Sequence, residues 1–467
     1  MQRYVTRMFA DQWQQWVPAV VVITVMATMI GLCVHQFAWT GDPLFRTAAS
    51  AAGVPVEEFQ ILSVTIYTVV ALVSWVALTV VGKASVHVIR RTHALWLLLG
   101  TSPAVVLGST LLLLTVVSLC GAILGALLST LLSFWALPAF NTMVSSAVQL
   151  PTYTPTAWAP IVVIVVSVLT ALGGGLSPAR QASRTPPGAA LRSLDGLGRK
   201  SATVPQVVCG VFFFLVAFSL VISAGFADSL GVTTPAPMFN LAINAGGSSL
   251  IAVYLLCPQI AGFIFRVLTG LLSRTGLVVS ALGTRSAASR VQVSATTIAP
   301  LAAGLGSIGL LLCSVNSVIA FAEILQPDGQ ANRADTWMMV IVIALMMLAT
   351  SAAVVALSAS GREHEIALLQ AAGMRGRQVV AMIASESFAM SLAASIIAAV
   401  PVAFGGLVFV LASQATLGGG TAVVAWPVPA MLVGLIASWA ALFIILLAPA
   451  LTPLREGPST QLRQQEI

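Results

Sequence analysis

Long apolar runs recur along the whole chain and are separated by short polar stretches. A run of about 20 mostly apolar residues is long enough to cross a membrane as an α-helix. The pattern therefore predicts ten transmembrane helices, at 17–38, 60–82, 104–135, 158–176, 204–225, 246–270, 293–322, 336–358, 379–412 and 426–449.

The composition agrees with a chain that is surrounded by lipid. Hydrophobic residues make up 58% of it and charged residues only 7%, whereas about a quarter of the residues of a soluble domain are charged. The mean hydropathy is +1.00. We therefore predict an all-α polytopic membrane protein, and the composition disfavours a soluble helical core.

The distribution of basic residues predicts the topology. An even number of spans places both termini on one side, and Lys and Arg favour the cytoplasmic side of short loops. With both termini in the cytoplasm, 19 of the 21 basic residues lie inside, and only Arg46 and Arg333 lie outside. The net charge of +7 thus indicates membrane topology and not nucleic-acid binding. The outer loops 39–59 and 323–335 are too short for a large extracytoplasmic domain.

The first sixteen residues are too polar for a signal peptide. Val5, Phe9, Trp13 and Trp16 recur at helical spacing, which is typical of an amphipathic segment lying in the membrane interface. An ordinary stretch with aromatic anchors beside the first span explains the same pattern.

Two pairs of similar segments indicate an internal repeat. One match aligns Gly100 with Gly373, and the other aligns Pro178 with Pro449 at an almost equal offset along the chain. We predict a 4+2+4 arrangement in which two parallel four-helix repeats flank a helical pair, related by a pseudo-two-fold axis along the membrane normal. The predicted units are 1–203, 204–280 and 281–467.

The most highly charged stretch, 361–380, lies between two long apolar runs. Glu363 and Glu365 suit the first turn of a short helix, Gly373 can end it in a left-handed cap, and Arg375 follows at its negative end. On these residues alone, a helix on the membrane surface whose arginines contact lipid phosphates is one explanation.

Two motifs of the chain resemble those of the MacB/FtsX-type permeases of ABC transporters. The first is R-x-x-E-I-A-L-L-x-A-x-G at the start of a long span, and the second is P-A-R-x-A-x-R-x-x-P-x-x-A-L-R after the following span. The second half carries the first motif best, at Arg362, Glu365 to Leu369, Ala371, Gly373, Arg377, Gln378, Glu386 and Ser387. The first half carries the second motif best, at Pro178, Ala179, Arg180, Ala182, Arg184, Pro187, Ala190, Leu191 and Arg192.

This resemblance implies that each repeat is a permease unit with a short cytoplasmic coupling helix before its third span. The coupling helices dock on a separate ABC ATPase dimer, which binds ATP and Mg, and the permease exports or extracts hydrophobic or amphipathic cargo or signals mechanically. It further implies a multi-pass protein of the bacterial cytoplasmic (plasma) membrane. The coupling residues it implies are Arg91, His93, Leu95, Gly100, Arg362, Glu363, Glu365, Leu368, Gly373 and Arg375.

The chain departs from the family pattern in two ways. Its first coupling segment, 90–95, lacks acidic residues where the second has Glu363 and Glu365, so we expect two chemically unequal docking sites. Its outer loops are short, whereas many relatives carry a large extracytoplasmic domain. The short loops weaken an analogy to tripartite efflux and favour a small amphipathic cargo.

No motif for nucleotide, metal or catalysis is complete. Gly82-Lys83 lacks the upstream glycine of a phosphate loop, since position 77 is Ala, and Gly304 to Gly309 fits a dinucleotide fingerprint only within a span. His364-Glu365 starts like a zinc-protease motif, but Leu368 stands where the second histidine belongs. The five cysteines lie in apolar runs, as packing residues do. We therefore expect that the chain is not an enzyme and that it binds no cofactor.

Four residues within the predicted spans are candidates for close helix packing or for a functional role. Gly121 and Gly125 allow close helix approach. Glu386 is either a functional intramembrane acid or an interfacial group paired with Arg375 or Arg377, and Asn316 either forms an interhelical hydrogen bond or contacts a ligand.

Three other functions compete with a transporting ABC permease. A secondary transporter with parallel repeats would need more intramembrane charge than Glu386 and Glu323 provide, and a membrane enzyme has no supporting cluster of histidines or carboxylates. A mechanotransmitting permease that signals without transport stays open.

Overall fold

The computed structural model is helical wherever it describes regular structure, and the described residues contain no strand. The described residues are 13–51, 100–144, 151–183, 204–229, 235–274, 278–289, 291–325, separate residues of 336–352, 369–370, 373–417 and 422–450.

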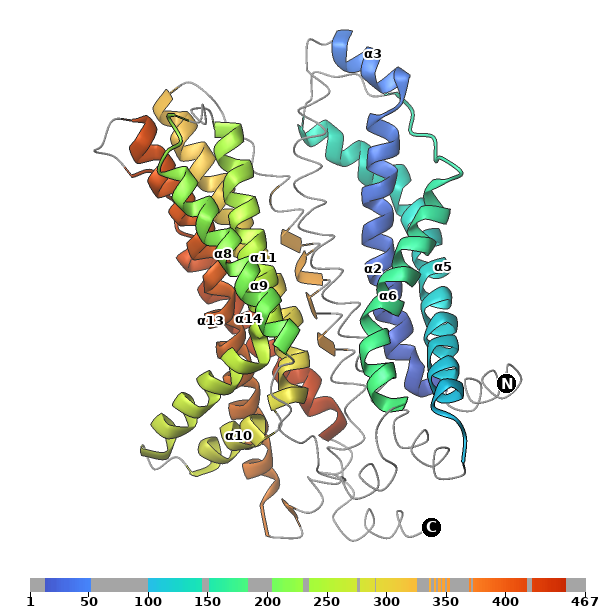
Figure 1. Ribbon diagram of the computed structural model, residues 1–467, viewed down its shortest axis with the longest axis vertical. Helices are drawn as coiled ribbons and strands as arrows, with labels where there is room; N and C mark the ends of the chain where they lie inside the picture. The colour runs from blue at the N-terminus through green and yellow to red at the C-terminus, as the bar shows by residue number, and fades with distance from the viewer. Residues whose placement is uncertain are drawn as a thin grey trace.

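The helices form two groups that lie beside each other (Figure 1). The first group consists of α2 (Trp13–Thr40), α3 (Pro43–Ala51), α5 (Pro103–Val144) and α6 (Ala159–Ser183). The second group consists of α8 (Val204–Ala224), α9 (Pro235–Arg274), α10 (Val278–Ser289), α11 (Val291–Leu325), α13 (Gly376–Thr416), α14 (Val428–Leu447) and the 3-10 turn η1 (Ala448–Ala450).

Eight described helices are long and apolar enough to cross a membrane. Each of them overlaps one of the ten predicted spans, although α9 is considerably longer than the predicted 246–270. The predicted span 60–82 lies outside the described residues, and the described residues of 336–358 are helical but scattered. The chain is therefore a polytopic helical membrane protein, and a count of ten spans stays a prediction.

The described helices differ from the sequence prediction in three places. Trp13 and Trp16 belong to α2 itself, and Trp16 is buried, so these two residues are not part of a separate interfacial segment; residues 1–12 lie outside the described part. The outer loop 39–59 contains α3, which begins after Asp42, whose Oδ1 accepts a hydrogen bond of 2.8 Å from the Leu44 N–H. The third difference is α10, a separate helix that the apolar pattern did not indicate.

Small residues bring α2 and α5 into close contact, as predicted for Gly121 and Gly125. A Cβ atom added to Gly121 would lie 2.7 Å from the Ile23 Cβ, and one added to Gly125 would lie 2.5 Å from the Ala27 Cβ. Because lipid gives apolar helices little hydrophobic reason to associate, such close backbone approach is a main source of their packing.

The same packing recurs in the second group. In the first group Gly31 of α2 faces Ser129 of α5, and in the second group Gly309 of α11 faces Val402 of α13. Ser129 and Val402 are separated along the chain by the same interval as Gly100 and Gly373. The two groups thus contain the same helix contact at equivalent positions of α5 and α13.

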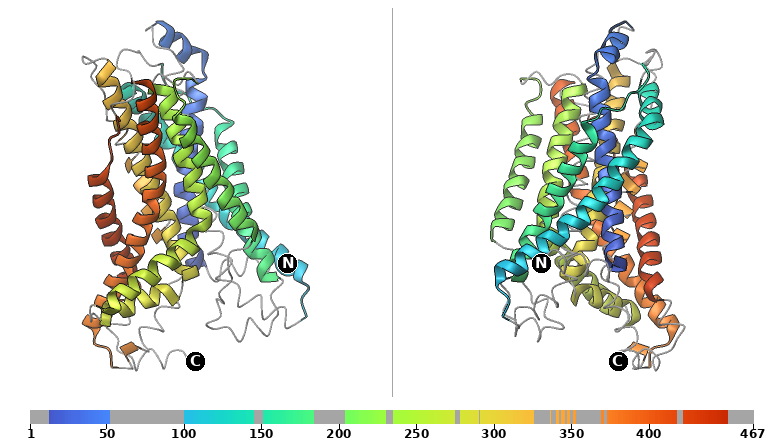
Figure 2. Two further views of the ribbon diagram at one scale, coloured as in Figure 1. Left: turned by 60° about the vertical axis from the view of Figure 1, so that its left-hand side comes forward. Right: turned by 90° about the vertical axis from the view of Figure 1, so that its right-hand side faces the viewer.

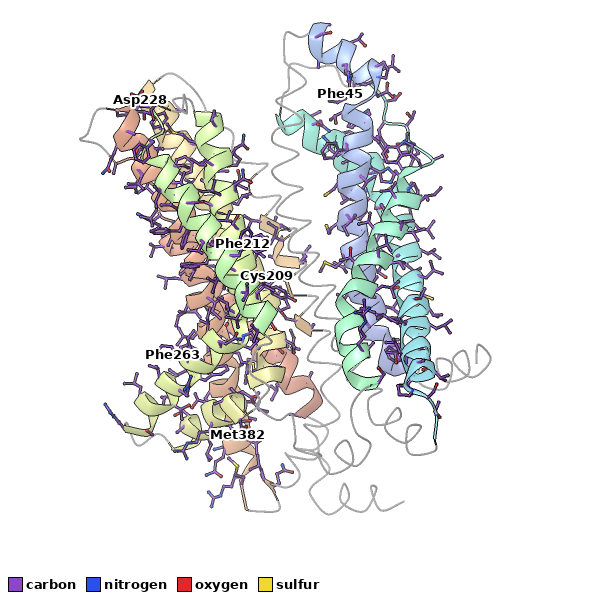
Figure 3. All side chains as sticks on the ribbon, viewed as in Figure 1. Phe45, Cys209, Phe212, Asp228, Phe263 and Met382 are labelled. Carbon is purple, nitrogen blue, oxygen red and sulfur yellow. The ribbon has the colours of Figure 1, made fainter. Side chains whose placement is uncertain are left out.

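The second group has a more deeply buried centre than the first. The α11 span is 89% buried and lies against α9 and α13, whereas the α14 span is only 17% buried. The pair α8 and α9 packs on α11 and α13 (Figure 2). Exposed aromatic side chains such as Phe212 and Phe263 cover the outer surface of this pair, as Figure 3 shows.

We predict that Gly125→Ala lowers the free energy of unfolding by about 1–3 kcal/mol, because the new methyl group meets the Ala27 Cβ at 2.5 Å and the Thr24 carbonyl oxygen at 2.7 Å. The matched control is Gly108→Ala in the same helix, where nothing lies within 4 Å of the added Cβ. That change should be neutral or stabilising by about 0.5–1 kcal/mol. Unfolding in mixed detergent micelles measures both, and equal effects would contradict the close packing of α2 and α5.

Candidate functional site

A tight turn at Gly373 connects the end of the charged segment to α13. The Gly373 N–H donates to the Gln370 carbonyl at 2.9 Å, and the Met374 N–H donates to the Leu369 carbonyl at 3.0 Å. Gly373 itself has a φ of +94°. These two bonds and the left-handed glycine make a Schellman motif, the C-terminal cap that the sequence predicts at this position.

Helix α13 begins only three residues after Gly373. Arg375 has extended backbone angles (φ −75°, ψ 148°) and is the N-cap of α13. Its N–H donates to the Gln378 Oε1 at 2.9 Å, and its carbonyl accepts from the Gln378 N–H at 2.8 Å. Met374, between the two caps, packs on a cluster of Val379, Ile383, Leu446 and Ala450. Hydrogen bonds and packing therefore hold the turn firmly to α13 and to the end of α14.

An equivalent turn precedes α5. Gly100 has a φ of +85°, and α5 begins three residues later at Pro103. The Ser102 carbonyl accepts the first helical bond, from the Val105 N–H at 3.0 Å. Proline is favoured in the first helical position because its missing N–H would have no partner there. The starts of α5 and α13 lie at the same end of the molecule, the lower end in Figure 1.

Gly100 and Gly373 are the two residues with a left-handed φ in the described part of the chain. Nothing lies within 4 Å of a Cβ added to either of them. The backbone conformation, and not crowding, is therefore the reason for glycine at both positions.

Glu386 lies further along α13, beside α10. A Cβ added to Gly283 of α10 would lie 2.6 Å from the Met382 carbonyl oxygen and 3.1 Å from the Glu386 nitrogen. Glu386 is only 3% exposed, whereas Arg375 and Arg377 are exposed. The structure therefore brings Glu386 together with α10, and its pairing with either arginine stays a prediction.

The other predicted site residues are described only in part. Asn316 is half-buried in α11, and the hydroxyl of its neighbour Ser317 accepts a hydrogen bond of 3.0 Å from the Ala425 N–H. Seven predicted coupling residues lie outside the described residues, namely Arg91, His93, Leu95, Arg362, Glu363, Glu365 and Leu368. The described part holds no group of three His, Cys, Asp or Glu residues that could bind a metal ion.

A buried polar cluster near the upper end of the first group was not predicted. His35 of α2 is fully buried and contacts the Tyr153 hydroxyl through Nδ1 at 2.8 Å and the Thr130 hydroxyl through Nε2 at 3.3 Å. Next to it, Gln36 and Asn141 exchange two side-chain hydrogen bonds of 2.8 and 2.9 Å. The cluster joins α2, α5 and the segment before α6.

The donors and acceptors around His35 assign its tautomer. Thr130 uses its only hydroxyl hydrogen on the Ala126 carbonyl at 2.8 Å, so it accepts from His35 Nε2–H. His35 Nδ1 then accepts from the Tyr153 hydroxyl, and burial raises the pKa of that hydroxyl, which keeps it protonated. A neutral His35 satisfies its own two hydrogen bonds, to Tyr153 and to Thr130. The sequence signal was the polar pair His35-Gln36 within an apolar run, but the pattern does not identify partners that lie so far away along the chain.

The sequence profile of the FtsX-like permease C-terminal family matches the chain twice, at residues 64–187 and 337–458. The two matches cover more than half of the 467 residues. The chain therefore belongs to the FtsX-like permease family, whose members are generally non-enzymatic membrane components of ABC transporters. No curated protein and no solved structure matches the chain.

The two family matches also confirm the internal repeat. Their first residues, 64 and 337, are separated by the same interval as Gly100 and Gly373. Their last residues, 187 and 458, are separated by the same interval as Pro178 and Pro449. Gly100 and Gly373 therefore lie at the same distance from the first residue of their family match.

We predict that Gly373→Ala lowers the free energy of unfolding by about 1–2 kcal/mol, because alanine resists the left-handed conformation. Gly373→Asn should cost less, since asparagine adopts that conformation more readily. Gly270→Ala is the control, because Gly270 is helical and equally uncrowded. Detergent unfolding tests the three variants. Equal effects of alanine at positions 373 and 270 would show that the turn does not need glycine.

We predict that Tyr153→Phe and His35→Leu each destabilise the protein, and that their effects are not additive. Each single change leaves a buried polar partner without its hydrogen bond, at a cost of about 1–3 kcal/mol. The double variant removes both partners, so a double-mutant cycle should give a coupling energy of about 0.5–2 kcal/mol. Full additivity would contradict the His35–Tyr153 bond.

Proposed function

We propose that this chain is the transmembrane permease subunit of an ABC transporter and couples ATP hydrolysis by a separate ATPase to the export or extraction of a hydrophobic or amphipathic cargo. The observation that carries the proposal is the matching pair of turns at Gly100 and Gly373. Each turn joins a predicted docking segment to one of the two longest described helices, and both lie at one end of the molecule.

The turn at Gly373 is suited to transmit force. Gly373 and Arg375 lie within three residues of the first residue of α13, and hydrogen bonds close the turn at each of them. Helix α13 has 41 residues and α5 has 42, so each is about 60 Å long at a rise of 1.5 Å per residue. A displacement at the turn therefore acts directly on the start of one long helix.

In this proposal the lower end of the molecule faces the cytoplasm, and the ATPase dimer binds there with its own ATP and Mg. The coupling residues of the first repeat, 1–203, are Arg91, His93, Leu95 and Gly100. Those of the second repeat, 281–467, are Arg362, Glu363, Glu365, Leu368, Gly373 and Arg375. Because only the second set contains acidic residues, the two docking sites have different charge. The linking pair, 204–280, completes a 4+2+4 arrangement.

The cargo class follows from the surfaces that the helices offer. Spans such as α14 and α8 are largely exposed and apolar, so a cargo that reaches the bundle from the side travels through lipid. The short outer loops leave little polar surface for recognising a large external partner. Both features favour a cargo with a substantial apolar part.

We predict that the ATPase co-purifies with this chain and that the paired reversal Arg362→Glu with Glu365→Arg weakens its binding at least about tenfold, which corresponds to about 1.4 kcal/mol. The control is Glu323→Arg, an exposed acid near the far end of α11. Pull-down with quantified ATPase measures the effect, and detergent unfolding checks that the permease stays folded. Intact assembly and unchanged vanadate-sensitive ATP hydrolysis after the reversal would refute the docking assignment.

A further inference from the structure

Helix α9 is longer than a membrane crossing requires. Its 40 residues correspond to about 60 Å at a rise of 1.5 Å per residue, whereas the hydrocarbon core of a bilayer is about 30 Å thick. Pro258 interrupts the helix, and Figure 1 shows the lower part of α9 turning away from the axis of its upper part. The upper part, from Pro235 to Pro258, is about 35 Å long. It is long enough to cross the core, so the lower part, 259–274, is not needed for the crossing.

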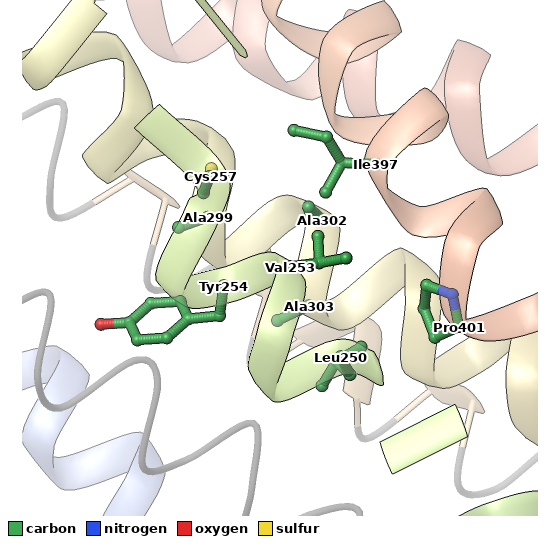
Figure 4. Close-up of a pocket in the computed structure, with 9 residues that line it drawn as sticks. All are labelled: Leu250, Val253, Tyr254, Cys257, Ala299, Ala302, Ala303, Ile397 and Pro401. Carbon is green, nitrogen blue, oxygen red and sulfur yellow. The ribbon is translucent and has the colours of Figure 1, made fainter. Parts of the chain in front are cut away.

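Above the bend, α9 is held by its neighbours. Tyr254 of α9 lines a narrow apolar recess together with Ala299 of α11 and Ile397 of α13 (Figure 4). The Gln206 side chain of α8 donates to the Leu255 carbonyl at 2.7 Å. A neighbouring helix thus supplies a donor close to the place where a proline removes one, which supports the backbone at the bend.

The lower part of α9 presents an apolar stripe on its outer side. Ala261 and Phe265 are buried in the cluster that joins α9 to α10, α11 and α13. Phe263, Val267 and Leu271 follow one another at intervals of four residues and are 56–62% exposed. This spacing places the three side chains along one side of the helix, and Figure 3 shows Phe263 on the outer side of the second group.

Polar residues form another side of the same segment. Gln259, Arg266 and Ser273 are exposed, and intervals of seven residues align them along the helix. The Arg266 Nε donates to the Gly262 carbonyl at 3.2 Å, which holds the guanidinium on this side. Arg274 is exposed at the end of the helix. An apolar stripe beside a polar side with arginines is the pattern of a helix that lies in a membrane interface.

Helix α10 continues this surface. It packs on α9 and α13, and its Gly283 lies against the α13 backbone at Glu386, whereas Leu282 and Arg285 are exposed. Two residues along a helix differ by about 200° in direction, so Arg285 lies on the opposite side of α10 from Gly283 and the buried Glu386. Residues 259–274 and α10 together are called the α9–α10 platform below.

The platform is basic and contains no acidic residue. Its exposed arginines are Arg266, Arg274 and Arg285, and the sequence has no Asp or Glu between Asp228 and Glu323. Figure 3 shows Asp228 at the opposite end of the molecule. A guanidinium group binds a phosphate through paired hydrogen bonds. The apolar stripe beside the arginines suits acyl chains, so the platform offers contacts to both parts of an anionic phospholipid.

We propose that the α9–α10 platform lies in the lower membrane interface and binds anionic phospholipid, with its three arginines at the headgroup phosphates and the apolar stripe among the acyl chains. Because α10 packs on the first turns of α13, the bound lipid holds the start of this long helix at a fixed depth in the membrane.

Spin labelling of the full chain in nanodiscs tests the placement. Serine replaces the three cysteines that are not buried, namely Cys33, Cys120 and Cys209. A label at Val267 should be reached more readily by oxygen, which dissolves in lipid, and a label at Ser273 by a nickel chelate, which stays in water. Leu124, exposed in the middle of α5, and Ser50, exposed on α3, give the reference values for lipid and water. A Val267 value equal to that of Ser50, or a Ser273 value equal to that of Leu124, would overturn the proposal.

Quenching by brominated lipids tests the headgroup preference. With a thiol-reactive fluorophore at Val267, brominated phosphatidylglycerol should quench at a mole fraction at least about fivefold lower than brominated phosphatidylcholine, since one arginine near an anionic surface contributes about this factor. A fluorophore at Leu124 should show no preference. The test variant replaces the three arginines together, as Arg266→Gln, Arg274→Gln and Arg285→Gln. It should abolish the preference at Val267, whereas Arg46→Gln on α3 should leave it unchanged.

No preference at Val267 in the unsubstituted chain, or equal effects of the triple variant and of Arg46→Gln, would overturn the lipid site. Salt at about 1 M should weaken the preference without any substitution, which keeps the test decisive if the triple variant does not fold; an unchanged preference would contradict the proposal. Soluble glycerol phosphate should not alter the quenching, and competition by it would show a site for free phosphate instead. The ATPase is absent from these measurements, so their failure is distinguishable from a failure of the docking assignment.

Discussion

A residue in the left-handed conformation can end one helix and let the chain enter the next within a few residues, and glycine adopts this conformation at the least cost. Gly100 and Gly373 meet this requirement at the starts of α5 and α13. The direction and firmness of the connection between each predicted docking segment and its long helix depend on this one conformation. The contacts that α5 and α13 make with the other helices determine how each of the two responds to a displacement at its turn.

The two halves of the molecule share their helix contacts but differ in mechanical support. The contact between α2 and α5 recurs between α11 and α13 at equivalent positions. Helix α13 is additionally packed by α8, α9 and α10, and it contains Pro401 where α5 has Leu128. The two halves are therefore asymmetric, since the α8–α9 pair packs on α13 and since Pro401 has no counterpart in α5. The two predicted docking segments differ in charge, which is a second asymmetry between the halves.

Features that depend on local sequence could be predicted, and features that depend on register between distant helices could not. The eight described spans and the cap at Gly373 follow from runs of apolar residues and from a glycine after a helical stretch. Helix α10 has 12 mostly small residues. It shows little apolar periodicity, so the sequence pattern did not indicate it. The His35–Tyr153 bond joins positions 118 residues apart. Such a juxtaposition cannot be predicted from the spacing of residues along the chain.

The central claim is that both glycine turns face the ATPase. Photo-crosslinking measures this directly, with a photoreactive amino acid placed in turn at Thr101 and Arg375 beside the turns, and at Asp42 and Asp228 at the opposite end. The account predicts that Thr101 and Arg375 each capture a protein that mass spectrometry identifies as the ABC ATPase, and that the other two positions do not. Capture of the ATPase from Asp42 or Asp228, with none from the two turns, would contradict it.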